Sequence, residues 1–282
     1  MNVLEAILFG IIQGLTEFLP ISSTGHLTIA GKLFGLISNE NPEHWTAFIA
    51  IIQLGTLAAI LFYFYNDIIK ILSEFFRENL FARKPLAQQG SNSKLGWLIL
   101  IGTIPIVIIG LLFRDTIEGA LTKNLYVIAS SLIILAFILF LAEKTGKFKK
   151  DIKDITLLDT IIIGFAQAIS LIPGSSRSGT TITGGLFTGL NREAAARFSF
   201  LLSIPAIFGS GLLQLNESLK FIDSSMMINL IVSTVFSGIS GYLAIDFLLK
   251  FLKKHSTYIF IYYRIALGII ILILISLNII QP

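Results

Sequence analysis

The sequence contains six apolar runs that are each about 20 residues long, the length that an α-helix needs to cross the hydrocarbon core of a bilayer. They cover residues 45–65, 95–113, 125–142, 198–215, 226–249 and 258–277. Only 13% of the 282 residues are charged, whereas globular domains carry roughly 25%. The sequence therefore predicts an all-α polytopic membrane protein with six transmembrane spans.

Two further apolar regions are too short to cross a bilayer, and each is interrupted by proline and small polar residues. A helix over residues 3–18 would be only ~24 Å long, against a hydrocarbon core of ~30 Å. Pro20 ends it, and Ser22, Ser23 and Thr24 can cap a second short helix that runs to about residue 36. Residues 156–173 and 180–190 show the same pattern. We predict that both regions form re-entrant helical hairpins, which dip into the membrane without crossing it.

The order of these elements predicts a single membrane domain, residues 1–282, that is built from two repeats. Residues 1–142 contain one hairpin and three spans, residues 156–282 contain the same set, and a lysine-rich connector at 143–155 joins them. Three spans are an odd number of crossings, so the second repeat enters from the opposite face of the membrane. Such inverted repeats bring their broken helices together near the middle of the membrane.

Basic residues are distributed unequally between the two sides of this predicted topology. One side carries Lys70, Arg77, Arg83, Lys84, Lys94, Lys144, Lys147, Lys149, Lys150, Lys153, Arg192, Arg197, Lys250, Lys253 and Lys254, whereas the other carries Lys32, Arg114, Lys123 and Lys220. Because loops rich in lysine and arginine stay in the cytoplasm, we predict that both termini and the mouth of the first hairpin are extracytoplasmic. The basic residues sit between apolar runs, so the net charge of +4 does not indicate a nucleic-acid partner.

The first hairpin carries a carboxylate and a histidine within an apolar region, where an ionisable residue is by default functional. Gln13 and Glu17 are four residues apart and therefore lie on one face of a helix. Glu17 can bind a hard cation such as Mg²⁺ or Ca²⁺ through oxygen, act as a base, or simply pair with Arg177. His26 can transfer a proton or attack phosphorus. Ser23 is three residues from His26, although serines at such positions are more often caps than nucleophiles.

The second hairpin has the composition of a phosphate-binding loop. Glycines in residues 173–181 allow backbone N–H groups to approach an anion, a helix N-terminus follows, and Arg177 offers a bidentate fork for phosphate. An ATP-binding P-loop is excluded, because Thr180 replaces its lysine and the context is not strand, loop and helix. The alternative is that the small residues serve close helix packing while Arg177 extends to the membrane interface.

Other polar residues have simpler interpretations. Arg264 beside Tyr262 and Tyr263 is interpreted as an anchor at the membrane interface, and Gln53 and Gln214 as hydrogen-bonding groups between helices. Residues 66–94 begin as an amphipathic stretch, which we predict to lie on the membrane surface.

The segments EFLPISSTGH and PGSSRSGTT, in this order, resemble the bacterial undecaprenyl-pyrophosphate phosphatases of the bacitracin-resistance type. The resemblance spans essentially the whole chain. It implies an integral hydrolase of the bacterial plasma membrane, which removes the terminal phosphate of the undecaprenyl (C55) diphosphate carrier, recycles the carrier for cell-wall synthesis and confers resistance to bacitracin. The family signatures fall on Gln13, Glu17, His26, Pro173, Gly174, Ser176, Arg177, Ser178 and Thr181 of this chain.

The chain departs from the family pattern at Gln13, where many relatives have glutamate. Glutamine is neither a base nor a strong metal ligand, so these roles fall to Glu17 alone. The phosphatidic-acid type of lipid phosphatase is excluded, because it needs a histidine six residues after the arginine and this chain has Thr183 there.

The predicted active site combines residues of both hairpins. The predicted catalytic residues are Glu17, Ser23, His26 and Arg177, with Glu17 also holding a Mg²⁺ or Ca²⁺ cofactor, and the predicted substrate-binding residues are Gln13, Ser22, Thr24, Gly174, Ser176, Ser178 and Thr181. The expected partners are a polyprenyl diphosphate and the bilayer, with a homodimer left open. A secondary transporter or flippase for an anionic lipid phosphate is the alternative, since transporters also use inverted repeats with broken helices. A hydrolase requires Glu17, His26 and Arg177 to converge within about 3–5 Å of one phosphate position.

Overall fold

The computed structural model describes residues 1–37, 42–119, 123–218 and 224–281, and in this part of the chain the regular elements are all helices. Those long and apolar enough to cross a membrane are the six helices α3 (Pro42–Tyr63), α5 (Ser91–Leu112), α7 (Leu125–Thr145), α10 (Arg192–Ser218), α11 (Ser224–Leu252) and α12 (Tyr258–Ser276). The predicted all-α polytopic membrane fold is therefore confirmed. α10 begins earlier than predicted, because Asn191 Oδ1 accepts a hydrogen bond from the Ala194 N–H at 2.8 Å and so caps the helix.

Each predicted hairpin is a pair of short helices joined by a loop that contains proline. The first pair is α1 (Val3–Phe18) and α2 (Ser23–Leu33), and the second pair is α8 (Leu157–Ile169) and α9 (Arg177–Phe187). Capping boxes begin α1, with Asn2 and Glu5, and α8, with Thr156 and Asp159. The Ser178 hydroxyl donates to the Leu19 carbonyl at 3.0 Å, so the two loops meet inside the molecule.

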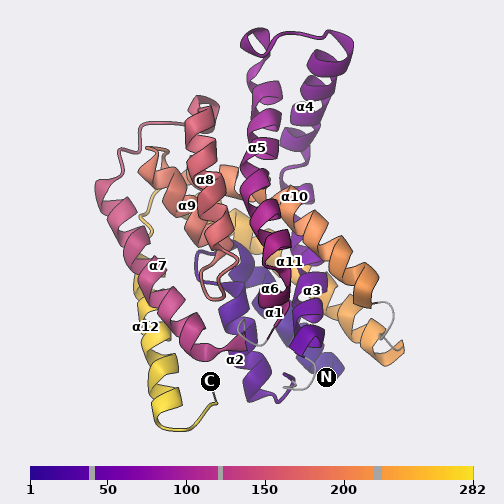
Figure 1. Cartoon of the computed structure of the whole chain (residues 1–282), viewed down its shortest axis with the longest axis vertical. Helices are drawn as coiled ribbons and strands as arrows, with labels where there is room; N and C mark the ends of the chain where they lie inside the picture. Colours follow the sequence, from indigo (N-terminus) through magenta and orange to yellow (C-terminus); the bar gives the residue numbers. More distant parts are fainter. Residues whose placement is uncertain (38–41, 120–122, 219–223, 282) are drawn as a thin grey trace.

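The helices of the two halves pack in matching pairs. α1 lies against α11 and α8 lies against α5, while α3 packs on α10 and α7 runs beside α12 (Figure 1). Glycines allow these close approaches: a Cβ on Gly164 would lie 2.6 Å from the Gly102 carbonyl oxygen. On this pairing we propose the division into repeat halves 1–142 and 156–282 with a connector at 143–155.

Gly14 makes the contact of α1 with α11 possible. A Cβ at this position would lie 2.1 Å from Ser240 Oγ and 2.4 Å from the Ser237 carbonyl oxygen. We expect Gly14→Ala to destabilise the protein by about 1–3 kcal/mol, because the backbone of α11 must move to accept the methyl group. Thermal unfolding in detergent measures the effect. Gly209→Ala on α10 is the control, since a Cβ there meets nothing within 4 Å, and an equal loss in both variants would contradict this account.

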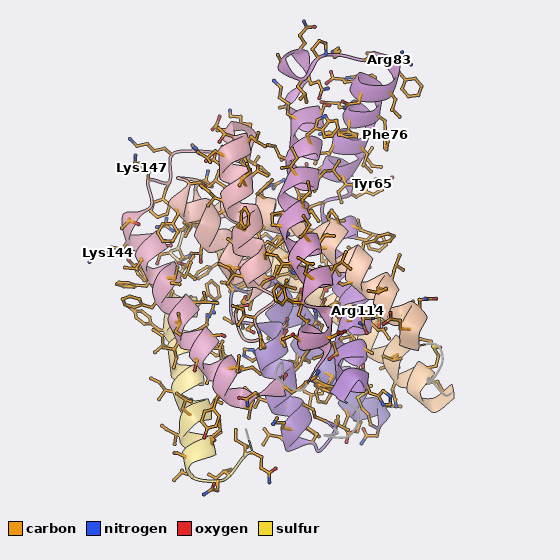
Figure 2. The ribbon with its side chains drawn as sticks, viewed as in Figure 1. Tyr65, Phe76, Arg83, Arg114, Lys144 and Lys147 are labelled. Carbon is orange, nitrogen blue, oxygen red and sulfur yellow. The ribbon has the colours of Figure 1, made fainter. Side chains whose placement is uncertain are left out.

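The amphipathic stretch does not lie flat on a surface, as the sequence led us to expect, but folds into a hairpin with the next span. α4 (Tyr65–Phe76) turns its Ile71 and Phe75 toward the first turns of α5. A Cβ on Gly96 would lie 2.8 Å from the Phe75 ring, and the centroids of the Phe75 and Trp97 rings are 5.0 Å apart. This hairpin projects beyond the other helices (Figure 1). Figure 2 shows Arg83 at its tip, with Lys147 toward the same end of the molecule.

Candidate active site

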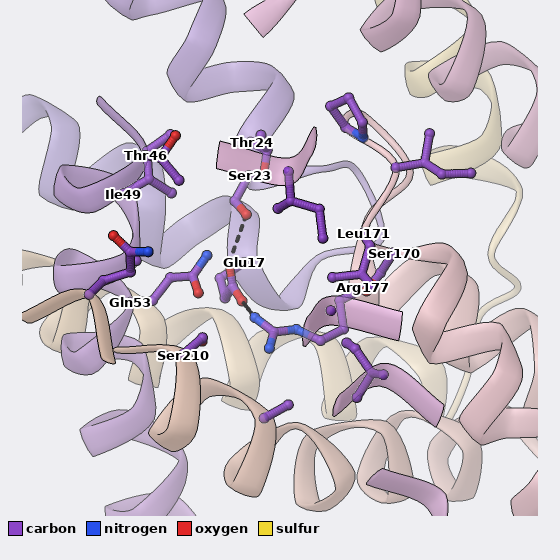
Figure 3. Close-up of a pocket in the computed structure, with 18 of the residues that line it drawn as sticks. Glu17, Ser23, Thr24, Thr46, Ile49, Gln53, Ser170, Leu171, Arg177 and Ser210 are labelled. Atoms are coloured by element: carbon purple, nitrogen blue, oxygen red, sulfur yellow. Dashed lines mark hydrogen bonds and ion pairs between the residues drawn. The ribbon is translucent and has the colours of Figure 1, made fainter. Parts of the chain in front are cut away.

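Glu17 lies at the centre of a buried polar cluster at the end of α1. Its Oε2 accepts hydrogen bonds from Ser23 Oγ at 2.7 Å and from Gln13 Nε2 at 3.0 Å. Its Oε1 pairs with the Arg177 guanidinium, which comes 160 residues later in the chain (Figure 3). The structure thus brings together four of the predicted site residues, and of the roles considered for Glu17 the pairing with Arg177 is the one that it shows.

The two loops deliver these residues with the same local geometry. Ser22 caps α2 with φ 76°, and Ser176 caps α9 with φ 69°. Each serine hydroxyl accepts a hydrogen bond from the backbone N–H three residues ahead, from Gly25 at 3.2 Å and from Gly179 at 3.1 Å. The residue that follows each cap belongs to the Glu17 cluster, since Ser23 opens α2 and Arg177 opens α9.

A cavity of about 530 Å³ opens beside the cluster, within the range of typical small-molecule sites. Glu17, Ser23 and Arg177 give it one polar end. Its walls are largely apolar and come from α5, α10 and the second loop, through Ile106, Val107, Leu111, Leu171, Ile172 and Leu213. The arrangement suits a ligand that has a small anionic group and a long apolar tail.

The predicted substrate-binding residues divide into two groups. Ser22, Thr24, Gly174 and Ser176 line the cavity together with Pro173. Gln13, Ser178 and Thr181 are not among the lining residues: Gln13 supports Glu17, Ser178 joins the loops, and the Thr181 hydroxyl donates to the Arg177 carbonyl at 2.7 Å. These three residues hold the site rather than contact its cavity.

Gly174 is required by the shape of the second loop. It has φ +85°, a conformation that residues with a Cβ rarely adopt. A Cβ here would also lie 2.5 Å from the Ile128 carbonyl oxygen of α7. The glycine therefore allows the loop to approach α7 closely, beside the cavity.

The two ring nitrogens of His26, which the sequence led us to expect beside Glu17 and Arg177, contact other groups. Its Nδ1 lies 2.7 Å from the Ser22 carbonyl oxygen and its Nε2 lies 2.6 Å from Tyr263 Oη. The two rings also stack, with centroids 5.6 Å apart. His26 is not among the residues that line the cavity. Ser23, by contrast, donates its hydroxyl hydrogen bond to the Glu17 carboxylate.

Arg264 is not an anchor at the membrane interface, and its interpretation from sequence was wrong. Its side chain is fully buried, at 0% exposed, and its Nη2 donates to the Ser175 carbonyl at 2.9 Å. Gln53 and Gln214, interpreted as links between helices, line the cavity. The sequence did contain a signal for Arg264, since the rule that singled out Glu17, an ionisable residue inside an apolar span, applies equally to it.

The Glu17 cluster offers few oxygen ligands for a divalent cation. Within the described residues, no group of three or more histidine or acidic side chains comes together. Gln13 Oε1, however, is buried without a hydrogen-bond partner in the described structure. One carboxylate and one orphaned amide oxygen fit a Mg²⁺ ion that completes its shell with substrate phosphate oxygens and water, which is its usual mode of binding.

Comparison with known proteins identifies the family. Residues 6–270 match the family model of the bacitracin resistance protein BacA. Three of the relatives are each named undecaprenyl-diphosphatase. The protein of Syntrophobacter fumaroxidans is 56% identical over 95% of both chains, and that of Chlorobaculum parvum is 52% identical over the full length of both. The protein of Chloroherpeton thalassium is 51% identical over 99% of this chain and 98% of its own. The resemblance drawn from the two motifs is confirmed, and the chain belongs to the family of the bacitracin resistance protein BacA.

Proposed function

We propose that this protein hydrolyses undecaprenyl diphosphate to undecaprenyl phosphate and inorganic phosphate. The observation that carries the proposal is the contact of the Ser23 hydroxyl with the Glu17 carboxylate, beside Arg177, at the polar end of an apolar cavity. A nucleophile, a base and an anion-stabilising group are the parts that phosphoryl transfer requires. The names of the relatives support the same substrate. Phosphate release from undecaprenyl diphosphate by the purified protein tests the proposal.

The geometry supports a reaction in two steps. In the first step Glu17 accepts the Ser23 hydroxyl proton while the Ser23 oxygen attacks the terminal phosphorus. The bond from this phosphorus to the bridging oxygen breaks, and undecaprenyl phosphate leaves with the proton from Glu17. In the second step a water molecule gives its proton to Glu17 and attacks the phosphoserine. Inorganic phosphate then leaves, and the Ser23 oxygen regains a proton from Glu17.

Arg177 stabilises the charge that develops on the transferred phosphoryl group. Its guanidinium pairs with Glu17 in the structure, and a bound diphosphate would compete for the same donors. Binding of the phosphate by this fork both neutralises the transition state and frees the Glu17 carboxylate to act as a base. We propose that a Mg²⁺ or Ca²⁺ ion, held by Glu17 and Gln13 Oε1, supplies further charge neutralisation when bound.

The family and the distribution of basic residues support a proposal for the cellular role. We propose that the protein lies in the bacterial plasma membrane, that its site opens to the extracytoplasmic side, and that it recycles the carrier for cell-wall synthesis and thereby confers resistance to bacitracin. Measuring the size of the protein in detergent tests for a homodimer, because it distinguishes a dimer from a monomer.

The proposed orientation predicts which surface positions an impermeant thiol reagent reaches in intact cells. Gln281, near the termini, and Gln88, at the tip of the α4–α5 hairpin, are both exposed, and the chain has no cysteine. We expect Gln281→Cys to be labelled in intact cells and Gln88→Cys only after the membrane is opened. The reverse pattern would place the active site on the cytoplasmic side.

Gln13→Glu tests the cation proposal and the departure of this chain from its relatives. A second carboxylate beside Glu17 raises the cost of keeping both ionised, and a divalent cation relieves that repulsion. We expect the variant to need a higher Mg²⁺ or Ca²⁺ concentration for half-maximal phosphate release and to lose more activity in a chelator than the wild type. An unchanged metal titration would place Gln13 outside the cation site.

A further inference from the structure

Both active-site loops contain a strained residue that surrounding contacts must hold. Ser22 has φ 76° and Ser176 has φ 69°, a region that residues with a Cβ avoid. Ser23 and Arg177 follow these two residues directly, and both contact Glu17. A rotation of the backbone at either serine would therefore move a member of the Glu17 cluster.

The first strained serine is held through His26 and Tyr263. The Ser22 carbonyl oxygen belongs to the peptide bond that joins Ser22 to Ser23, and His26 Nδ1 lies 2.7 Å from it. A carbonyl only accepts hydrogen bonds, so Nδ1 carries a proton and donates. In the neutral ring Nε2 then accepts from the Tyr263 hydroxyl at 2.6 Å. Tyr263 thus fixes the imidazole, through this bond and the stacked rings, and the imidazole fixes the peptide bond before Ser23.

The second strained serine is held by Arg264, the next residue of α12. The carbonyl of Ser175 belongs to the peptide bond that precedes Ser176, and it accepts from Arg264 Nη2 at 2.9 Å. Gly179 leaves the space that the guanidinium occupies, since a Cβ there would lie 2.7 Å from Nη1. Arg264 Nε and Nη1 have no partner within the described residues. A fully buried guanidinium with a single hydrogen bond is unfavourable by itself, which points to a functional role.

We propose that Tyr263 and Arg264 are positioning residues, which hold one strained serine in each loop and thereby orient Ser23 and Arg177 around Glu17. Neither residue is among those that line the cavity, so neither contacts the substrate there. One turn of α12 thus sets both halves of the site. The proposal rests on the proposed phosphatase activity only for its kinetic readout. Tyr263 acts on the nucleophile side, and Arg264 acts on the phosphate-binding side.

The kinetic test uses variants that remove one contact each. We expect Tyr263→Phe, which keeps the ring, to lower kcat about tenfold while KM and the inhibition constant of inorganic phosphate stay near the wild-type values. Tyr262→Phe is the matched control, since its side chain is exposed and its kcat should not change. We expect Arg264→Met to raise the inhibition constant of inorganic phosphate about tenfold. Arg264→Lys should raise this constant by a smaller factor, because it keeps a buried donor. Thermal unfolding checks that all variants are folded. The proposal would be overturned if Tyr263→Phe kept the wild-type kcat and Arg264→Met kept the wild-type inhibition constant of phosphate.

A second readout does not depend on turnover. Ser23→Cys introduces a single thiol into a chain without cysteine, at a position that lines the cavity. We expect Tyr263→Phe to change the rate at which a small thiol reagent labels this cysteine several-fold, and Tyr262→Phe to leave it unchanged. Equal rates in both backgrounds would overturn the positioning role. A changed rate together with no phosphate release by the wild type would instead reject the phosphatase and keep the positioning role.

Discussion

Replacing Ser23 with alanine should lower phosphate release from undecaprenyl diphosphate by at least about 1,000-fold, the scale seen when a catalytic nucleophile is removed. The side chain is small and its hydroxyl donates to Glu17 at 2.7 Å, so alanine removes the nucleophile with little change in packing. Steady-state release of phosphate in detergent measures the effect. Ser73→Ala is the control, because Ser73 is exposed on α4 and its hydroxyl donates to the Lys70 carbonyl, away from the Glu17 cluster.

The same variant distinguishes Ser23 from water as the nucleophile. With substrate labelled in its terminal phosphate, an acid quench should leave label on the wild-type protein and none on Ser23→Ala. Normal turnover by Ser23→Ala would remove Ser23 from the reaction and leave Glu17 to activate water directly. A large loss of activity without any labelled protein in the wild type would make Ser23 a support for Glu17 only.

Arg177→Lys should lower the rate by at least about 100-fold, although the positive charge is kept. An ammonium group is a single point charge and cannot offer the two parallel N–H donors with which a guanidinium binds phosphate. The pair with Glu17 remains available to lysine, so we expect the variant to fold and to unfold at a similar temperature. Arg83→Lys, at the exposed tip of the α4–α5 hairpin, is the matched control. Near-normal turnover by Arg177→Lys would show that Arg177 has a structural role only.

The local elements of this fold could be predicted because their signals lie within a few residues. Pro20 and Pro173 mark the loops, the capping boxes at Asn2 and Thr156 mark the starts of α1 and α8, and Ser22 caps α2 as expected. The approach of Glu17 to Arg177 was predictable for a different reason. Both are charged groups in apolar surroundings, and two such groups in facing hairpins stabilise each other by pairing.

The surroundings of His26 and Arg264 could not be predicted in the same way. His26 is held by a tyrosine 237 residues later, and no local pattern indicates which side chain of α12 will face it. Arg264 looked like an interface residue because tyrosines precede it, but α12 begins at Tyr258 and places Arg264 deep against the second loop. The direction of α4 was missed because the apolar face of an amphipathic helix can cover either a membrane surface or another helix, and its periodicity does not distinguish the two.

The most direct test of the account is the release of inorganic phosphate from undecaprenyl diphosphate by the purified wild-type protein in detergent, compared with Glu17→Gln. Glutamine keeps the size of the side chain but cannot accept the Ser23 proton. We predict that the wild type releases one phosphate for each undecaprenyl phosphate formed and that Glu17→Gln releases almost none. Substrate that stays intact with the wild type, or equal release by both proteins, would contradict the assignment of a hydrolase centred on Glu17.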